Sequence, residues 1–175
     1  LNNEIKALQG KTIKKLEDQL GFLTGGNTYP YILPLANSKN PNMYSLQFWA
    51  IGKYPLYNFK MKISVIYNGK SETLIESHKP ESEIRQMSPT IIPEKNGLNL
   101  DNYPNLELLI ESTAKNSSWQ QRIKFRKDSA KNNYDFKTSV IPLSGDQTPL
   151  SSKDFTENPS LGPLSNMESL NYKKN

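Results

Sequence analysis

The sequence contains no cysteine, and this absence removes several kinds of site at once. Disulfide scaffolds, thiolate zinc sites and cysteine nucleophiles all need a residue type that the chain does not have. Histidine occurs once, at His78, so the chain has no histidine-rich metal site and few candidates for acid–base chemistry. We therefore expect no catalytic residues, no metal ligands and no cofactor.

Long apolar runs are also missing. No segment approaches the roughly 18 consecutive apolar residues of a membrane-spanning helix, and no signal-peptide pattern opens the chain. Because the chain begins at Leu1 rather than at Met, we expect that an upstream segment has been removed. Only 35% of the 175 residues are hydrophobic, which suits one packed domain with polar appendages.

Residues 1–23 predict an amphipathic helix. Apolar residues recur at the spacing of one helical face, with one irregular step near Gly10, while Gly21, Gly25 and Gly26 supply a stop signal. A helix of about this length is marginal alone in water, so its apolar face needs a partner: a second copy in a short coiled coil, or the following domain. We favour the coiled coil. The expected oligomerisation residues, here called the leucine stripe, are Ile5, Leu8, Ile13, Leu16, Leu20 and Leu23.

Residues 24–141 predict a mainly β domain. Apolar and polar residues alternate over 59–67, and Asn68-Gly69 follows as a hairpin turn. Several short strands with one apolar face each predict two packed sheets, an antiparallel β-sandwich of immunoglobulin or C2 type with about seven or eight strands. The expected strands are 29–35, 43–51, 59–67, 71–76, 88–92, 106–112, 119–127 and 134–140.

Residues 142–175 predict a tail without regular structure. Proline, serine, asparagine and glycine fill most of this segment, and its few apolar residues show no sustained period. Such a composition cannot bury enough surface to offset the entropy lost on ordering. We therefore expect a disordered or loosely draped tail.

The chain carries a net charge of +5, and its densest cations run from Arg122 to Lys127. Arg122, Lys124 and Arg126, here called the basic patch, alternate along one predicted strand and so project from one face. Such a patch can follow nucleic-acid phosphates. If the two neighbouring predicted strands form a hairpin, however, Glu107 falls opposite Lys124, and cross-strand ion pairs are ordinary in sheets. We favour this structural role over nucleic-acid binding.

Aromatic residues make up 10% of the chain, and four tyrosines near strand ends are candidate ligand-binding residues: Tyr29, Tyr31, Tyr54 and Tyr57. Exposed aromatic rings on a β-sandwich can stack on sugar rings. An alternative function is therefore a sandwich that binds a carbohydrate or a small anion. Core packing or capping of the sandwich end is the competing role for the same residues.

Catalysis has little support in the sequence. His78 lies in a polar segment that predicts a loop, with no recognisable nucleophile motif nearby. The carboxylate pairs Glu81–Glu83 and Glu107–Glu111 would each share one face of a strand, but the outer face of a sandwich offers no cleft. We therefore expect that the protein is not an enzyme.

Three segments carry a resemblance to a known group of proteins. Residues 24–35 read Thr-Gly-Gly-Asn-Thr-Tyr-Pro-Tyr-Ile-Leu-Pro-Leu, residues 52–59 read Gly-Lys-Tyr-Pro-Leu-Tyr-Asn-Phe, and residues 114–121 read Ala-Lys-Asn-Ser-Ser-Trp-Gln-Gln. They resemble segments of uncharacterised bacterial membrane-tethered proteins, in which a Thr-Gly-Gly-Asp-Ser-aromatic segment follows a coiled coil. The departures from that pattern are Asn27, Thr28, Lys115 and Ser117.

The resemblance covers about residues 1–141 and implies transmembrane helices upstream of Leu1, then a short helical stalk, then the sandwich. It defines no catalytic residues. Together with the leucine stripe, it favours a non-enzymatic interaction module beside a membrane that forms a dimer or trimer through its helix and meets an unidentified protein partner. Any contact with the membrane would run through the upstream segment, and the side of the membrane stays open.

Overall fold

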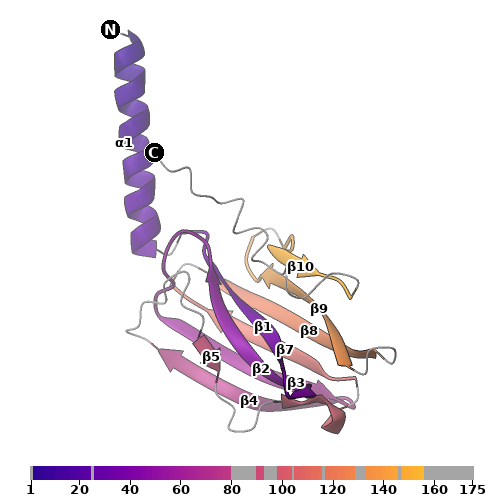
Figure 1. The fold of residues 1–175 in the computed structure, drawn as a ribbon. Helices are drawn as coiled ribbons and strands as arrows, with labels where there is room; N and C mark the ends of the chain where they lie inside the picture. The colour runs from indigo at the N-terminus through magenta and orange to yellow at the C-terminus, as the bar shows by residue number, and fades with distance from the viewer. Residues whose placement is uncertain are drawn as a thin grey trace.

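The computed structural model describes residues 2–24, 26–79, 90–92, 98–103, 105–115, 117–128, 133–145 and 147–155. Within them the chain forms one long helix, α1 (Asn2–Thr24), followed by two antiparallel sheets. Figure 1 shows α1 projecting from one end of the packed sheets, with its N-terminus farthest away. The mainly β fold with an N-terminal helix is therefore confirmed.

The smaller sheet has four strands, in which β2 is central. β1 (Tyr29–Asn37) pairs with one edge of β2 (Asn40–Ile51), and the other partners of β2 are β5 (Thr90–Ile92) and β6 (Leu98–Asn99). A short 3-10 helix, η1 (Leu100–Asn102), follows β6.

The larger sheet has six strands in the order β10-β9-β8-β7-β3-β4. Its strands are β3 (Phe59–Tyr67), β4 (Lys70–Lys79), β7 (Glu107–Thr113), β8 (Ser118–Asp128), β9 (Asn133–Pro142) and β10 (Ser151–Lys153). Asn68 and Gly69 form the predicted hairpin turn between β3 and β4, with φ of 48° and 72°. Both values are positive, as a type I′ turn requires.

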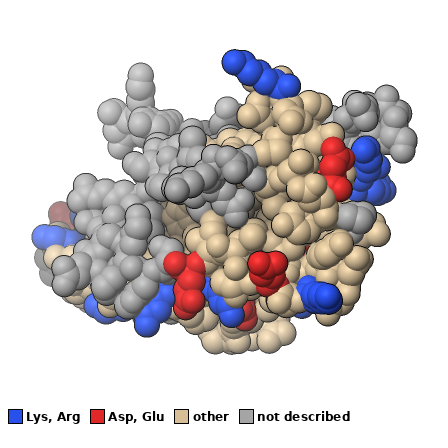
Figure 2. All heavy atoms as spheres, turned by 90° about the horizontal axis from the view of Figure 1, so that it is seen from below, with Lys and Arg blue, Asp and Glu red and all other residues tan. Residues whose placement is uncertain are grey.

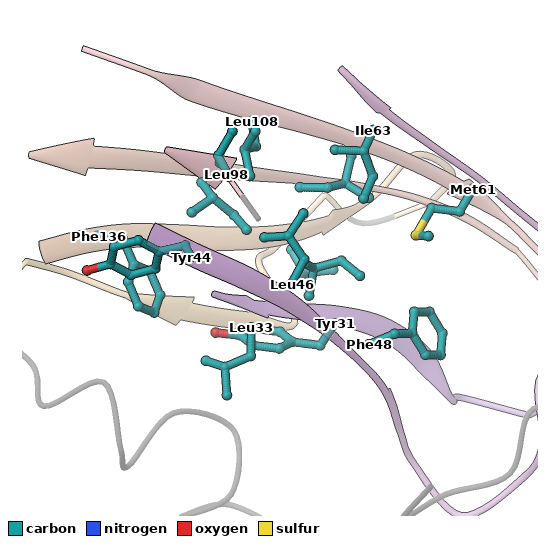
Figure 3. Packing of buried hydrophobic residues seen from close by; sticks show 14 of the residues in the cluster. Tyr31, Leu33, Tyr44, Leu46, Phe48, Met61, Ile63, Leu98, Leu108 and Phe136 are labelled. Carbon is teal, nitrogen blue, oxygen red and sulfur yellow. The ribbon is translucent and has the colours of Figure 1, made fainter. Parts of the chain in front are cut away.

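The core lies between the two sheets and follows from the alternation in the sequence. In Figure 3, Leu46 and Leu98 of the four-stranded sheet point toward Ile63 and Leu108 of the six-stranded sheet. Aromatic rings also pack across the core, where Phe48 of β2 meets Phe59 of β3 edge to face with ring centroids 5.0 Å apart. This burial of alternate side chains is the main source of stability for the sandwich.

One buried amide ties the two sheets together. Gln121 of β8 is 3% exposed, and its Oε1 accepts a hydrogen bond from the backbone N–H of Ile32 in β1 at 2.8 Å. Its Nε2 donates to the Ile32 carbonyl at 2.9 Å and to Thr138 Oγ1 at 2.9 Å. The side chain thus takes the place of a neighbouring strand at the free edge of β1, which is buried from Pro30 to Pro34.

The predicted helix runs without a break through Gly10. Two features differ from the sequence-based expectations. β4 extends to Lys79, so the backbone of His78, opposite Lys60, lies in a strand rather than in the predicted loop, because pairing with β3 continues beyond the alternating segment. The tail prediction was wrong where it meets β9: Pro142 ends that strand and Ser151–Lys153 pair with it as β10. Backbone pairing supplies this order, which composition does not reveal. Residues 156–175 of the predicted tail lie outside the described residues.

Candidate functional site

Three parts of the chain that are far apart in sequence meet at one end of the sandwich. The antiparallel topology explains why: β1 and β3 begin at this end, β2 and β7 finish there, and α1 arrives just before β1. The connections between these elements therefore gather around the C-terminal end of the helix. We call the resulting contact region the joint; its residues are Asp18, Gly21, Gly26, Thr28, Gly52, Lys53, Tyr54 and Lys115.

The ring of Tyr54 is the centre of the joint. It lies against Gly21 in the last turns of α1 and against Gly26 in the turn that follows, so closely that a Cβ added at either glycine would overlap the ring. Gly26 also has a φ of +52°, a conformation that side chains with a Cβ rarely adopt. The two glycines therefore make a slot for the tyrosine, and the helix is held against the β2–β3 connection.

A carboxylate on the helix, that of Asp18, binds the two side chains of the β2–β3 connection that reach α1. Asp18 accepts a hydrogen bond from the Tyr54 hydroxyl at 2.8 Å and pairs with the Lys53 ammonium group. The hydrogen bond from Lys53 is the main reason that the pKa of Asp18 lies below its ordinary value, and the bond from Tyr54 lowers it further. The same contacts raise the pKa of Lys53 and that of Tyr54. The joint therefore favours the charged carboxylate.

A buried threonine fixes the loop that presents Tyr54. Thr28 is fully buried, and its Oγ1 accepts a hydrogen bond from the Tyr54 backbone N–H at 3.0 Å. Gly52 has a φ of +143° and packs directly on Thr28, where a Cβ would meet the Thr28 backbone. The β2–β3 connection is thus anchored to the segment between α1 and β1.

Lys115 caps the end of the helix. Its Nζ donates to the carbonyl oxygen of Leu23 at 3.0 Å, and its backbone N–H donates to the carbonyl of Tyr57 at 3.0 Å. The last carbonyls of a helix lack partners within the helix and carry partial negative charge, so a lysine there is stabilising. The β7–β8 connection thereby joins the helix to the β2–β3 connection.

The joint uses one face of α1 and leaves the opposite face open. With about 100° of rotation per residue, Asp18 and Gly21 lie roughly opposite the centre of the leucine stripe. The side chains of the stripe are between 46% and 67% exposed, and Leu23, in the final turn of the helix, has the highest value. Docking on the sandwich therefore does not cover the stripe.

The four candidate tyrosines do not form one exposed platform. Tyr31 is 1% exposed and belongs to the core, so it cannot stack on a ligand at the surface. Tyr54 is held in the joint. Tyr29 and Tyr57 are half-buried; Tyr29 packs against the core and its hydroxyl lies 3.5 Å from the Leu150 carbonyl oxygen.

The basic patch lies on the outer face of β8 and is interspersed with carboxylates. Glu107 is opposite Lys124, as the hairpin prediction required, and it contacts both Arg122 at 3.0 Å and Lys124 at 3.2 Å. The guanidinium carbon of Arg126 lies 4.2 Å from the ring centre of Phe155, a residue of the C-terminal segment. Figure 2 likewise shows basic and acidic atoms interspersed on the face that it presents. This arrangement is typical of a structural charge network.

Beyond these contacts, the described residues form no cluster that would make a metal site. They contain no group of three or more His, Asp or Glu side chains that could hold a metal ion. Glu81 and Glu83, and the side chain of His78, lie outside what the structure describes. The described part of the chain also has no helix long and apolar enough to cross a membrane.

Comparisons with protein-family models, with curated proteins and with solved structures found no match to this chain. The joint nevertheless gives a physical account of the three segments that carry the sequence resemblance. Gly26 and Thr28 come from the first, Gly52 to Tyr54 from the second, and Lys115 from the third.

Sequence reasoning missed three residues of the joint. Asp18 is one of the polar residues between the apolar positions of the predicted helix, Gly21 is part of its stop signal, and Lys115 stood out only as a departure from the resemblance. Their partners are 36, 33 and 92 residues away along the chain, at Tyr54 and Leu23. The sequence offered one signal, the glycines at the end of the helix, Gly21 and Gly26. Glycines allow another group to approach the backbone closely, but they do not show that this group is the ring of Tyr54.

Proposed function

We propose that this chain is a non-enzymatic interaction module that associates with copies of itself through the leucine stripe and presents its β-sandwich at the end of a helical stalk. The observation that supports it is the division of α1 into two faces. The face with Asp18 and Gly21 is engaged by the sandwich, while the six apolar side chains of the stripe stay between 46% and 67% exposed.

The energetics favour a second copy as the occupant of the stripe. Burying one exposed leucine or isoleucine contributes about 1.5–3 kcal/mol, and a pair of helices would bury several on each side. This sum is comparable with the roughly 4–15 kcal/mol that association costs in lost freedom. A helix that is held to its own domain at only one end also gains the most from a neighbour along its length.

The resemblance adds a membrane anchor upstream of Leu1 to this proposal. In that arrangement the stalk would set the sandwiches at a distance from the membrane, where they could meet a further protein partner. Because Tyr31 is buried and Tyr54 is used in the joint, the structure supplies no observation that favours the alternative of a carbohydrate or anion site at these tyrosines.

Light scattering on the purified chain tests the proposal. We expect a dimer or trimer, and a monomer for a shortened chain that begins at Thr24. The double variant Leu16→Gln, Leu20→Gln should also be monomeric, because it removes apolar surface from the middle of the stripe. Its matched control, Lys11→Gln with Lys14→Gln on the far side of the helix, should keep the mass of the parent chain. A parent chain that stays monomeric at high concentration would contradict the proposal.

A further inference from the structure

The leucine stripe has a spacing that distinguishes between ways of pairing two helices. From Ile5 to Leu23 its members are separated by three, five, three, four and three residues. The two ends of the stripe are thus 18 residues apart, which is five turns at about 3.6 residues per turn, the period of a straight helix rather than the 3.5 of a heptad supercoil. The stripe runs nearly parallel to the helix axis, over about 27 Å.

The single five-residue step favours parallel, in-register pairing. In that arrangement each residue of the stripe lies level with its own copy, so the step from Leu8 to Ile13 meets the same step in the partner. In antiparallel pairing the five-residue step would face the four-residue step from Leu16 to Leu20. The apolar layers would then be out of line by one residue, about 1.5 Å, in the middle of the interface.

The charges beside the stripe agree with parallel pairing. Glu4 and Lys15 flank the stripe on one side, and Lys6 and Glu17 flank it on the other. In a parallel pair, one flank of each helix faces the opposite flank of its partner. Glu4 then lies near the level of Lys6 of the second copy, and Lys15 near the level of Glu17, so both contacts join opposite charges.

The joint also determines where the sandwiches lie relative to the paired helices. Asp18 and Gly21 face away from the stripe and are held to Lys53 and Tyr54 of the β2–β3 connection. In any bundle formed through the stripe, this connection must lie on the outside. With helix axes about 8–10 Å apart and helices about 10–12 Å across, the connections of two copies would be separated by roughly 20 Å or more.

We infer that the chain assembles as a parallel, in-register bundle with the sandwiches held outward by the joint, so that their surfaces remain open to other molecules. This inference rests on the proposed self-association and goes beyond it by fixing direction, register and the position of the domains. The partner at the stripe is a second copy of this chain.

Single-cysteine variants can test the inference cleanly because the parent chain has no cysteine. Under mild oxidation we expect Leu20→Cys to give a disulfide-linked dimer, since in-register copies bring the two residues together. Lys14→Cys, on the far face, is the matched control and should stay unlinked. In antiparallel pairing Leu20 would instead lie opposite Leu8, with the two Leu20 positions about 18 Å apart.

Spin labels at Lys60→Cys, an exposed residue near the start of β3 and outside the joint, report the position of the sandwiches, because Lys53, Tyr54 and Asp18 keep their contacts in that variant. We expect label separations of roughly 20 Å or more. A shorter separation, or one spread over short and long distances, would overturn the outward arrangement.

The outcomes separate this inference from the function on which it rests. A monomeric mass overturns the proposed self-association itself. An oligomeric mass without a Leu20 cross-link, but with a cross-link in a mixture of Leu20→Cys and Leu8→Cys chains, leaves self-association intact and overturns the parallel register. An oligomer with the Leu20 cross-link and distant Lys60 labels supports the full arrangement.

Discussion

At the scale of single residues, the sandwich depends on one side chain, that of Gln121, whose hydrogen bonds replace those of a neighbouring strand. Gln121 offers a donor and an acceptor to the same residue, Ile32, as a neighbouring strand would, and it reaches Thr138 as well. Peptide groups buried without partners cost about 1–3 kcal/mol each, so an apolar residue of the same size could not replace this amide. The position therefore calls for an amide, although Trp119 and Ile123, the buried residues on either side of it along β8, are apolar.

We predict that Gln121→Leu destabilises the sandwich by about 3 kcal/mol, because it leaves the N–H and C=O of Ile32 buried without their partner. Urea unfolding followed by tryptophan fluorescence measures this change. The control is Gln120→Leu on the opposite face of β8, where the loss should stay below about 1 kcal/mol. Equal losses in the two variants would mean that the bonds to Ile32 add nothing to stability.

Asp18 should make the joint sensitive to acid. Its pKa is lowered from the ordinary value of 3.8 in the folded chain, chiefly by the hydrogen bond from Lys53, so the docked state is favoured while the carboxylate is charged. The contribution of the charged Asp18 to docking is fully present well above pH 3.8 and is lost as the pH falls through the lowered pKa. We expect distances between spin labels at Lys14→Cys and at Lys70→Cys to broaden below that pH. In Asp18→Asn they should already be broad at neutral pH and change little on acidification.

At the scale of elements, helix α1 and the sandwich meet through a small contact of definite shape. The ring of Tyr54 occupies a slot between two glycines, and the surrounding hydrogen bonds come from three different connections. A contact of this kind sets the direction of the helix even though it buries little of it. The direction of α1 is thus encoded jointly by these loops and by Asp18 and Gly21 near the end of the helix.

We predict that Tyr54→Ala leaves the sandwich folded but frees the helix, because the slot is emptied and Asp18 loses one donor. The distribution of label distances between Lys14→Cys and Lys70→Cys should become several times wider, while the near-ultraviolet circular dichroism of the sandwich stays close to that of the parent. Tyr54→Phe is the matched control, since it keeps the ring and removes only the hydroxyl, and it should give an intermediate width. A narrow distribution for Tyr54→Ala would show that the ring does not orient the helix.

The charge network on the larger sheet leads to another prediction at this scale. Glu107 contacts two cations of the basic patch, so Glu107→Gln should leave Arg122 and Lys124 available to anions. We expect later elution from a heparin column, while stability falls by less than about 1 kcal/mol because the cations are half exposed. Glu111→Gln makes the same change of charge on the same strand, opposite Gln120. Equal retention of the two variants would indicate an effect of net charge alone.

Much of this architecture could be predicted from the alternation of residues along the chain. The strands near 59–67 and 119–127, the Asn68-Gly69 turn and the pairing of Glu107 with Lys124 all follow from local patterns. Contacts across long stretches of sequence could not be predicted in this way. The joint and the bonds of Gln121 to Ile32 depend on where the topology brings distant segments, and β10 depends on a neighbour for its hydrogen bonds.

At the scale of the whole molecule, the chain combines two units with different sources of stability. The sandwich has a closed core between its sheets, from Ile32 and Phe48 to Ile63 and Val140. Among the described residues, the helix touches the sandwich only near its C-terminal end, and its apolar stripe is exposed in a single chain. Since an isolated helix of this length is marginal in water, its stability should come from other copies and so from concentration.

We therefore predict two unfolding transitions, of which only one responds to protein concentration. On dilution, the helical signal at 222 nm should melt at progressively lower temperature, because dissociation exposes the stripe and removes the contacts that stabilise the helix. The near-ultraviolet signal of the sandwich should melt at a constant temperature over the same range. In the variant Leu16→Gln, Leu20→Gln the helical transition should lose its dependence on concentration while the sandwich transition stays in place. A single transition, independent of concentration and shared by both signals, would instead show that helix and sandwich unfold as one unit and that the joint couples them more strongly than its small contact suggests.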